Sequence, residues 1–162
     1  MITDFDMKDI ASKYRIPVNE IFMKDEPPRR ITSGGYIINL DDEETGRNGT
    51  HWTALYIPKN INKPIMYCDS FGFIIPQSLI NWIKKYGGVY KDNQIICNDK
   101  QIQDVNTGGC GVYSLFFIQC ANNWDNYFKP IRLMNEYNKL WSDDTKDNLN
   151  LLKEYVPYYM ES

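Results

Sequence analysis

A cysteine preceded by two glycines and followed by an apolar run is the feature that most restricts how this chain can fold. In QDVNTGGCGVYSLFF, residues 103–117, Gly108 and Gly109 loosen the backbone or let another group approach it closely. The apolar residues from 110 to 121 predict a helix buried in a core. Cys110 would then stand in the first turn of that helix, where the helix dipole favours a thiolate.

The rest of the chain predicts one helix, then strands, then more helices, which is typical of an α+β fold with one mixed sheet. We expect helices over residues 4–16 (capped by Thr3 and ended by Pro17), 76–87, 110–121, 129–141 and 144–156. We expect strands over residues 36–40, 51–57 and 63–69, with short candidates at 93–98 and 101–103. Residues 24–35 predict a loop and residues 41–50 a polar hairpin loop. We expect residues 1–162 to form a single domain, because the length suits one core and no repeat divides it.

Composition excludes several classes of protein. Hydrophobic residues make up 43% and charged residues 24%, which is a soluble globular composition. No apolar run approaches the roughly 20 residues that a membrane span requires, and the first residues carry acids where a secretory signal has an apolar region. The net charge of −3 gives no basic excess for nucleic acid or an anionic membrane. We therefore expect a protein of a reducing cytosol that needs neither nucleic acid nor a membrane.

The cysteines predict neither a metal site nor a disulfide framework. Four are present: Cys68, Cys97, Cys110 and Cys120. They show no CxxC spacing, and the chain has one histidine, so we expect no zinc site and no other cofactor. A disulfide framework does not suit a chain of this size in a reducing compartment.

The lone histidine decides which residue can serve as a base for a cysteine nucleophile. His51 begins a predicted strand, and Asp69 ends the next one, where adjacent antiparallel strands bring such positions side by side. A carboxylate there would orient the imidazole and stabilise its protonated form. The free N–H groups of the first helical turn offer donors for an oxyanion at Cys110, and the Gln103 side chain offers another.

Each of these residues also has an ordinary structural interpretation. A buried cysteine is more often a small hydrophobic residue than a nucleophile, and we keep that interpretation for Cys68, Cys97 and Cys120. Asp69 before Ser70 is also compatible with a turn cap. The catalytic interpretation depends on the combination, because a histidine, an acid and a helix-initiating cysteine occur in one usable order.

That order, histidine then acid then cysteine, differs from the order of papain-like enzymes. It resembles the adenovirus-type maturation proteases (adenain) and their relatives, the proteases of SUMO and other ubiquitin-like proteins. GTHWTALYI is similar to the histidine strand with its His-Trp pair, and YCDSFGF to the end of the acidic strand. QDVNTGGCGVYSLFF is similar to the nucleophile segment with its Gln-x6-Cys-Gly pattern. The resemblance runs in blocks from about residue 36 to 122 and leaves the last 40 residues unmatched.

The resemblance implies an adenain-like cysteine protease fold and a thiol endopeptidase. Cys110 would be the nucleophile, His51 the base and Asp69 the residue that orients it, while Gln103 would help hold the oxyanion. In this family the residue that matches Trp52 walls a tight cleft, so the resemblance implies glycines before the cut; we expect Gly109 to line the same cleft. The Phe-Gly-Phe after Asp69 favours the adenain branch, whereas aspartate in place of glutamate favours the SUMO-protease branch.

The resemblance leads us to expect a virus-encoded maturation protease. It would be a monomer that processes capsid or other virion precursors at Gly-Gly-like sites, in the host cytoplasm (the virus factory) and in the virion. A large DNA virus or a virophage is the expected source. A peptide activator fits the family, and Cys97 lies roughly where adenain has a cysteine that bonds such a peptide, although the spacing differs.

Three alternatives share the same residues. A deubiquitinase or SUMO-type isopeptidase would cleave after the C-terminal glycines of a folded ubiquitin-like partner. An acyltransferase would use the same three side chains, but the sequence shows no acetyl-CoA site. A binding module that keeps the fold would carry an inert Cys110.

Overall fold

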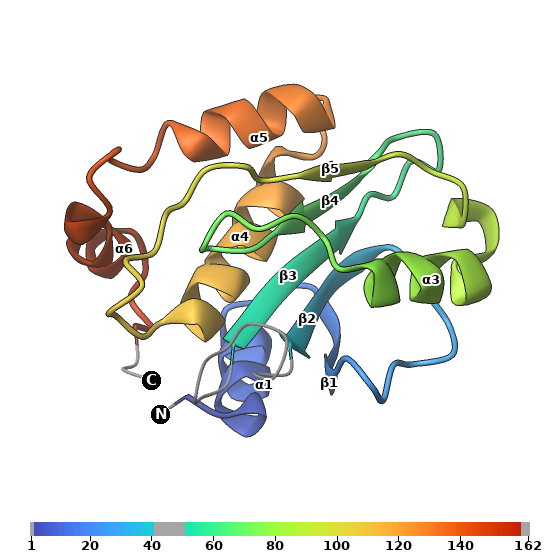
Figure 1. The fold of residues 1–162 in the computed structure, drawn as a ribbon, viewed down its shortest axis with the longest axis horizontal. Coiled ribbons are helices and arrows are strands. Elements are labelled where there is room, and N and C mark those ends of the chain that lie inside the picture. Colours follow the sequence, from blue (N-terminus) through green and yellow to red (C-terminus); the bar gives the residue numbers. More distant parts are fainter. Residues whose placement is uncertain (1, 41–50, 160–162) are drawn as a thin grey trace.

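A five-stranded mixed sheet forms the centre of the molecule in the computed structural model, which describes residues 2–40 and 51–159 (Figure 1). The strands lie in sequence order: β1 (Val18–Met23), β2 (Gly34–Leu40), β3 (His51–Ile57), β4 (Ile65–Cys68) and β5 (Ile95–Cys97). The outer pairs, β1 with β2 and β4 with β5, are parallel, and the inner pairs are antiparallel. The predicted α+β class with one mixed sheet is confirmed.

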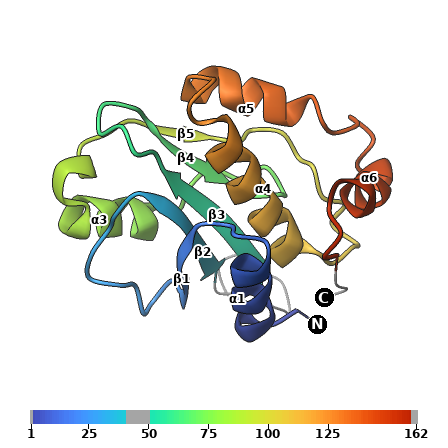
Figure 2. The same ribbon diagram turned by 180° about the vertical axis from the view of Figure 1, so that it is seen from behind.

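Helices cover both faces of this sheet. They are α1 (Asp4–Lys13), α3 (Gln77–Tyr86), α4 (Cys110–Trp124), α5 (Pro130–Asn138) and α6 (Asn148–Tyr155), with 3-10 turns at Gly88–Tyr90 and Thr145–Asp147. Figure 2 shows α4 running along one face with α1, α5 and α6 around it, while α3 covers the other face. Among the described residues, no helix combines the length and the apolar character that crossing a membrane requires.

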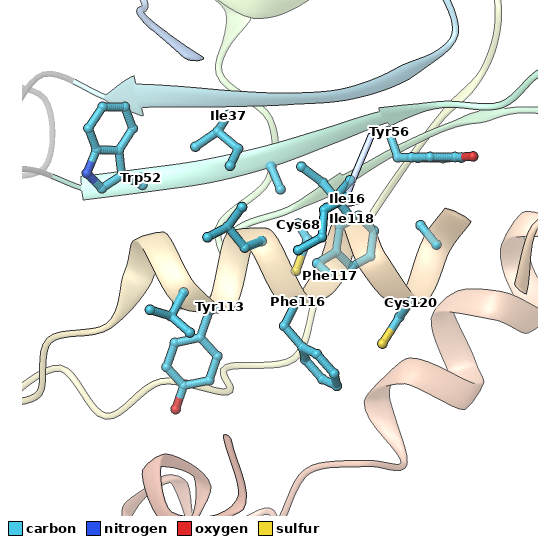
Figure 3. Packing of buried hydrophobic residues seen from close by; sticks show 14 of the residues in the cluster. Ile16, Ile37, Trp52, Tyr56, Cys68, Tyr113, Phe116, Phe117, Ile118 and Cys120 are labelled. Atoms are coloured by element: carbon cyan, nitrogen blue, oxygen red, sulfur yellow. The ribbon is translucent and has the colours of Figure 1, made fainter. Parts of the chain in front are cut away.

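The two faces of the sheet carry two separate apolar clusters. Along β3, Ala54 and Tyr56 join the cluster beneath α4, whereas Leu55 and Ile57 join the cluster beneath α3. Side chains alternate between the faces of a strand, so a strand covered on both sides is apolar throughout. Figure 3 shows the α4 side, where Ile37 and Ile118 lie between the sheet and α4, while Tyr113 and Phe116 extend from α4 away from the sheet. There they pack against Trp141.

A glycine lets α4 approach the sheet closely. A Cβ atom on Gly35, in β2, would lie 2.5 Å from a methyl carbon of Ile118, so a larger residue there would push the helix away. The close approach fixes the position of α4 relative to β2 and β3. It therefore also fixes the position of Cys110, the first residue of α4.

The structure contains most of the expected elements, with shifted helix ends: α1 stops at Lys13, α4 extends to Trp124, α5 stops at Asn138 and α6 begins at Asn148. Beyond these ends it differs at three places. The helix after Thr3 has the expected cap, since the Thr3 side chain accepts from the Asp6 backbone in a capping box. Strand β1 was not predicted, because polar and apolar residues do not alternate along it. In the structure its burial is correspondingly uneven. Residues 101–103, a strand candidate, form no strand, and β2 begins at Gly34, inside the expected loop. The predicted hairpin loop at 41–50 lies outside the described residues.

Candidate active site

Cys110 opens α4 after a glycine in the left-handed conformation. Gly109 is the N-cap with φ +101°, a backbone conformation that L side chains rarely adopt. The Cys110 side chain is only 6% exposed, and the backbone N–H of Trp52 donates to its Sγ atom at 3.4 Å. Gly111 leaves room beside it for Ile2 and Met7, whose side chains would lie 3.0 Å from an added Cβ. The thiol is therefore set into the core with a donor already directed at the sulfur.

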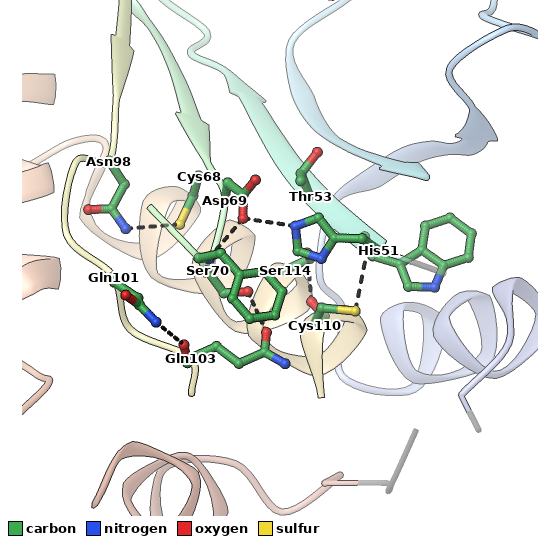
Figure 4. A network of polar contacts seen from close by, with 12 residues as sticks. His51, Thr53, Cys68, Asp69, Ser70, Asn98, Gln101, Gln103, Cys110 and Ser114 are labelled. Atoms are coloured by element: carbon green, nitrogen blue, oxygen red, sulfur yellow. Dashed lines mark hydrogen bonds and ion pairs between the residues drawn. The ribbon is translucent and has the colours of Figure 1, made fainter. Parts of the chain in front are cut away.

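His51 and Asp69 form the polar pair next to this thiol. The Nε2 atom of His51 lies 2.8 Å from Oδ1 of Asp69, and the two residues are 2% and 1% exposed (Figure 4). The same Oδ1 atom accepts the backbone N–H of Phe71 at 2.8 Å, and the Phe71 ring packs against the imidazole. The Phe71 N–H and the His51 ring thus hold the Asp69 carboxylate in place, and the carboxylate in turn orients the imidazole.

The second imidazole nitrogen, Nδ1, faces the side of the ring where Cys110 lies (Figure 4). This atom is buried and meets no partner at hydrogen-bond geometry within the described residues. Cys110 is nevertheless close enough to act on the charge of the ring, since it is one of the groups that raise the His51 pKa. Nδ1 is therefore the atom placed to exchange a proton with the sulfur.

The environment keeps the His51 ring protonated at neutral pH. Burial is the largest single effect and lowers its pKa, because a charged ring loses solvation. The hydrogen bond and charge of Asp69, together with Cys110, outweigh burial and raise the pKa to about 9. An imidazolium beside a helix N-terminus is the setting in which a thiolate is stabilised.

Burial dominates the environment of the other three cysteines. Burial raises the pKa of Cys68 far above its ordinary value, raises that of Cys120 to about 12 and also raises that of Cys97. They therefore stay protonated at neutral pH, which agrees with their predicted role as small hydrophobic residues.

Gln103, the predicted oxyanion donor, has its side-chain amide fully hydrogen-bonded in this conformation. Its Nε2 group donates to the carbonyl oxygens of Thr107 and Gly108, at 2.7 and 2.9 Å. Its Oε1 atom accepts from the Ser70 hydroxyl at 2.6 Å. Both N–H bonds of the amide are thus used to hold the loop that leads into Cys110. One of those carbonyls has to be released before Gln103 can donate to a substrate.

Trp52, predicted to wall the substrate cleft, packs beside the start of α4. Its ring lies against the first turn of α4, 3.6 Å from where a Cβ of Gly111 would be. It also borders a groove of about 460 Å³ that runs along β1 and carries the carboxylates of Asp4, Glu20 and Glu26. The rings of Tyr113 and Tyr159 flank Gly109 at 3.6 Å from an added Cβ.

Two further contacts brace the site; the turn at Asp69 agrees with the turn cap that the sequence allowed, whereas the second contact had no prediction. The turn after β4 holds Asp69 in place, since its carbonyl accepts the N–H of Gly72, which has φ +84°. The buried Asn148, in α6, donates to the carbonyl of Ile102, next to Gln103. The Phe-Gly pair after Asp69 signals the turn, but nothing in the sequence signals the Asn148 contact. Among the described residues, no three His, Cys, Asp or Glu side chains converge as a metal site would require.

Solved structures of a protease have the same fold. Two crystal structures of the ASFV pS273R protease match, each at 16% sequence identity. One match has a TM-score of 0.59 and covers all of this chain and 68% of the other; the second has a TM-score of 0.52 and covers 83% and 61%. No protein-family model and no curated protein matches the sequence.

These matches show that the chain shares the fold of the pS273R protease. The chain spans about two thirds of the length of the pS273R protease, and at this identity the likeness is one of fold.

Proposed function

We propose that the chain is a cysteine endopeptidase. The observation that carries the proposal is the position of His51, held by Asp69 on one ring nitrogen and facing Cys110 with the other. The protease fold of the two matching structures supports the same class of reaction.

The proposed reaction has two stages. The Cys110 thiolate attacks the scissile carbonyl carbon, and the C–N bond breaks as the His51 imidazolium gives its proton to the leaving amine. Water then attacks the thioester while neutral His51 accepts its proton, and the Cys110 thiolate leaves. The first-turn N–H of Cys110 and the Gln103 amide stabilise the oxyanion in each stage, once Gln103 has released a loop carbonyl. Asp69 holds the ring and stabilises its charge throughout.

The proposed substrate has glycines just before the cut. The Cys110 side chain is almost fully buried, Trp52 packs across the first turn of α4, and Gly109 lies between two tyrosine rings. A peptide chain without side chains at that point fits such a site, whereas a branched residue is excluded by size. We propose viral capsid or other virion precursors with Gly-Gly-like sites, cut by a monomer in the host cytoplasm and the virion. The likeness to a viral protease supports this choice.

The test uses two fluorogenic peptides that differ only in having Gly-Gly or Ala-Ala before the scissile bond. We expect the Gly-Gly peptide to be cleaved at least about 10-fold faster in kcat/KM, a difference that small steric changes in a pocket supply. Cys110→Ala should abolish cleavage of both. Cleavage that survives this substitution, or no cleavage by the wild type with or without a virion extract as a source of activator, would overturn the proposal.

A second comparison separates the two kinds of protein substrate. Virion precursor proteins and ubiquitin-like fusion proteins are incubated with wild type and with Cys110→Ala, and new N-termini are sequenced. Cuts within virion precursors support maturation, whereas cuts confined to the C-terminal glycines of the fusions support the isopeptidase alternative.

A further inference from the structure

We propose that Ser70 is a positioning residue that sets the orientation of the Gln103 amide for catalysis. The inference rests on the proposed function, since it concerns how the oxyanion donor is held. Ser70 directly follows Asp69, so two consecutive residues at the end of β4 serve the two halves of the site.

The contact between Ser70 and Gln103 is short and fully enclosed. The Ser70 hydroxyl donates to Oε1 at 2.6 Å, and the two residues are 4% and 1% exposed. The backbone carbonyl of Ser70 also accepts the N–H groups of Ile102 and Gln103, each at 2.8 Å. Ser70 therefore holds Gln103 by both its backbone and its side chain (Figure 4).

The chemistry of an amide explains why the hydroxyl matters. The oxygen and the nitrogen of the Gln103 amide have nearly the same size, so only their partners decide which one faces the loop that leads into Cys110. With Oε1 on the Ser70 hydroxyl, Nε2 points to the loop of Thr107 and Gly108 that leads into the nucleophile. A flipped amide would place its oxygen against two carbonyl oxygens and near the developing oxyanion.

The hydroxyl becomes more important at the moment of reaction. The loop carbonyls also orient the amide, but one of them has to be released when Nε2 donates to the oxyanion. The Ser70 contact lies on the far end of the amide and does not have to break. It is the contact that keeps a donor, and not an acceptor, directed at the oxyanion.

The test is a double-mutant cycle on the Gly-Gly peptide with Ser70→Ala, Gln103→Ala and the double variant. We expect Ser70→Ala to lower kcat about 10-fold with little change in KM, less than the 10²-fold or more typical of deleting an oxyanion donor. In the Gln103→Ala background, Ser70→Ala should change kcat less than twofold, because the amide that it positions is gone. Ser70→Thr keeps the hydroxyl and should restore most of the rate.

Two further measurements separate positioning from a structural role. Alkylation of Cys110 by iodoacetamide forms no oxyanion, so its rate should be the same in Ser70→Ala and wild type. Ser114→Ala is the matched control, since Ser114 is equally buried and its hydroxyl donates at 2.8 Å to the Cys110 carbonyl; we expect less than a twofold change in kcat. If Ser70→Ala does not fold, Ser70→Cys, a near-isosteric and weaker donor, takes its place with the same expectations.

The outcomes are distinct. Wild-type cleavage with an unchanged rate in Ser70→Ala, or rate losses that multiply fully in the double variant, overturns the role of Ser70 and leaves the proposed function intact. A parallel loss of alkylation and cleavage in Ser70→Ala also overturns it, because it shows a general disruption of the site. If the wild-type protein cleaves no peptide, the proposed function itself is overturned.

Discussion

The carboxylate of Asp69 and the imidazole of His51 meet at 2.8 Å in a place where neither side chain reaches solvent. Burying a charge without a partner costs free energy, so each group stabilises the charged form of the other. The pair also fixes the orientation of the ring, because Asp69 binds Nε2 and Nδ1 then lies on the side of Cys110. The predictions below depend on this arrangement.

The first prediction concerns pH. The His51 pKa is raised to about 9, so kcat/KM for the Gly-Gly peptide should fall as the pH rises through about 9, where the imidazolium loses its proton. The protonated ring also stabilises the folded state. This contribution to the free energy of unfolding is fully present below pH 6.5, the ordinary pKa of histidine, and is lost as the pH rises through about 9. A shift of this size corresponds to about 3 kcal/mol. Rate profiles and urea unfolding between pH 6 and 10 test both parts; a flat profile through pH 9 would contradict them.

Asp69→Asn separates the charge of Asp69 from its geometry. The amide oxygen can still accept from His51 and from the Phe71 N–H, so the turn stays, but the negative charge is lost. We expect kcat to fall at least about 10²-fold with a smaller change in KM, and the alkaline limb of the profile to move to lower pH. An unchanged limb would mean that Asp69 serves only the turn.

Alkylation distinguishes ionisation from exposure. Among the four cysteines, Cys97 is partly exposed and the other three are buried, so exposure alone predicts that Cys97 reacts first. The imidazolium beside Cys110 predicts the opposite order at pH 6, with Cys110 modified roughly 10²-fold faster or more. Peptide mapping after a short iodoacetamide treatment gives the order, and His51→Ala should remove the preference. Uniform slow labelling would favour the non-catalytic binding module.

The turn that holds Asp69 contains Gly72, and Gly88, elsewhere in the chain, is a matched control because it also has a positive φ. A Cβ at Gly72 would lie 2.9 Å from the backbone nitrogen of Gln101, whereas at Gly88 it would meet nothing within 4 Å. Gly88→Ala should therefore lower the free energy of unfolding by about 1 kcal/mol, the strain of a side chain in the left-handed conformation. Gly72→Ala should cost clearly more, about 3 kcal/mol, and should also lower kcat. Urea unfolding measures the difference; equal costs would show that the backbone contact yields easily.

Much of the fold could be predicted because its signals are local. Thr3 caps the first helix, and Pro76 stands directly before α3, at its N-cap, where the expected helix began. The apolar run after Gly109 becomes the central helix, since a long apolar segment has to be buried. Strand β1 could not be predicted, because its pairing with β2 depends on residues elsewhere in the chain.

In the site, too, the residues marked by local sequence signals could be predicted and the long-range contacts could not. The side chains expected to meet, His51, Asp69 and Cys110, do lie together, because each stands at an element end that the pattern marks. Their catalytic roles, and that of Gln103, stay predictions for the experiments above. Ser70 was visible in the sequence only as the neighbour of Asp69. Its contact spans 33 residues and depends on a loop conformation that no local signal encodes.

The contact between Asn148 and the carbonyl of Ile102 has a consequence for the order in which the protein can assemble. Asn148 also exchanges hydrogen bonds with the backbone of Ser142, so it ties the start of α6 to the connection after α5 and to the segment that carries Gln103. A ribosome releases the chain from its N-terminus, and all four proposed catalytic side chains emerge before this fastener does. The nascent chain therefore exposes these four side chains before the Asn148 contact to the Ile102 carbonyl can form, and until then Ser70 is what holds the Gln103 segment.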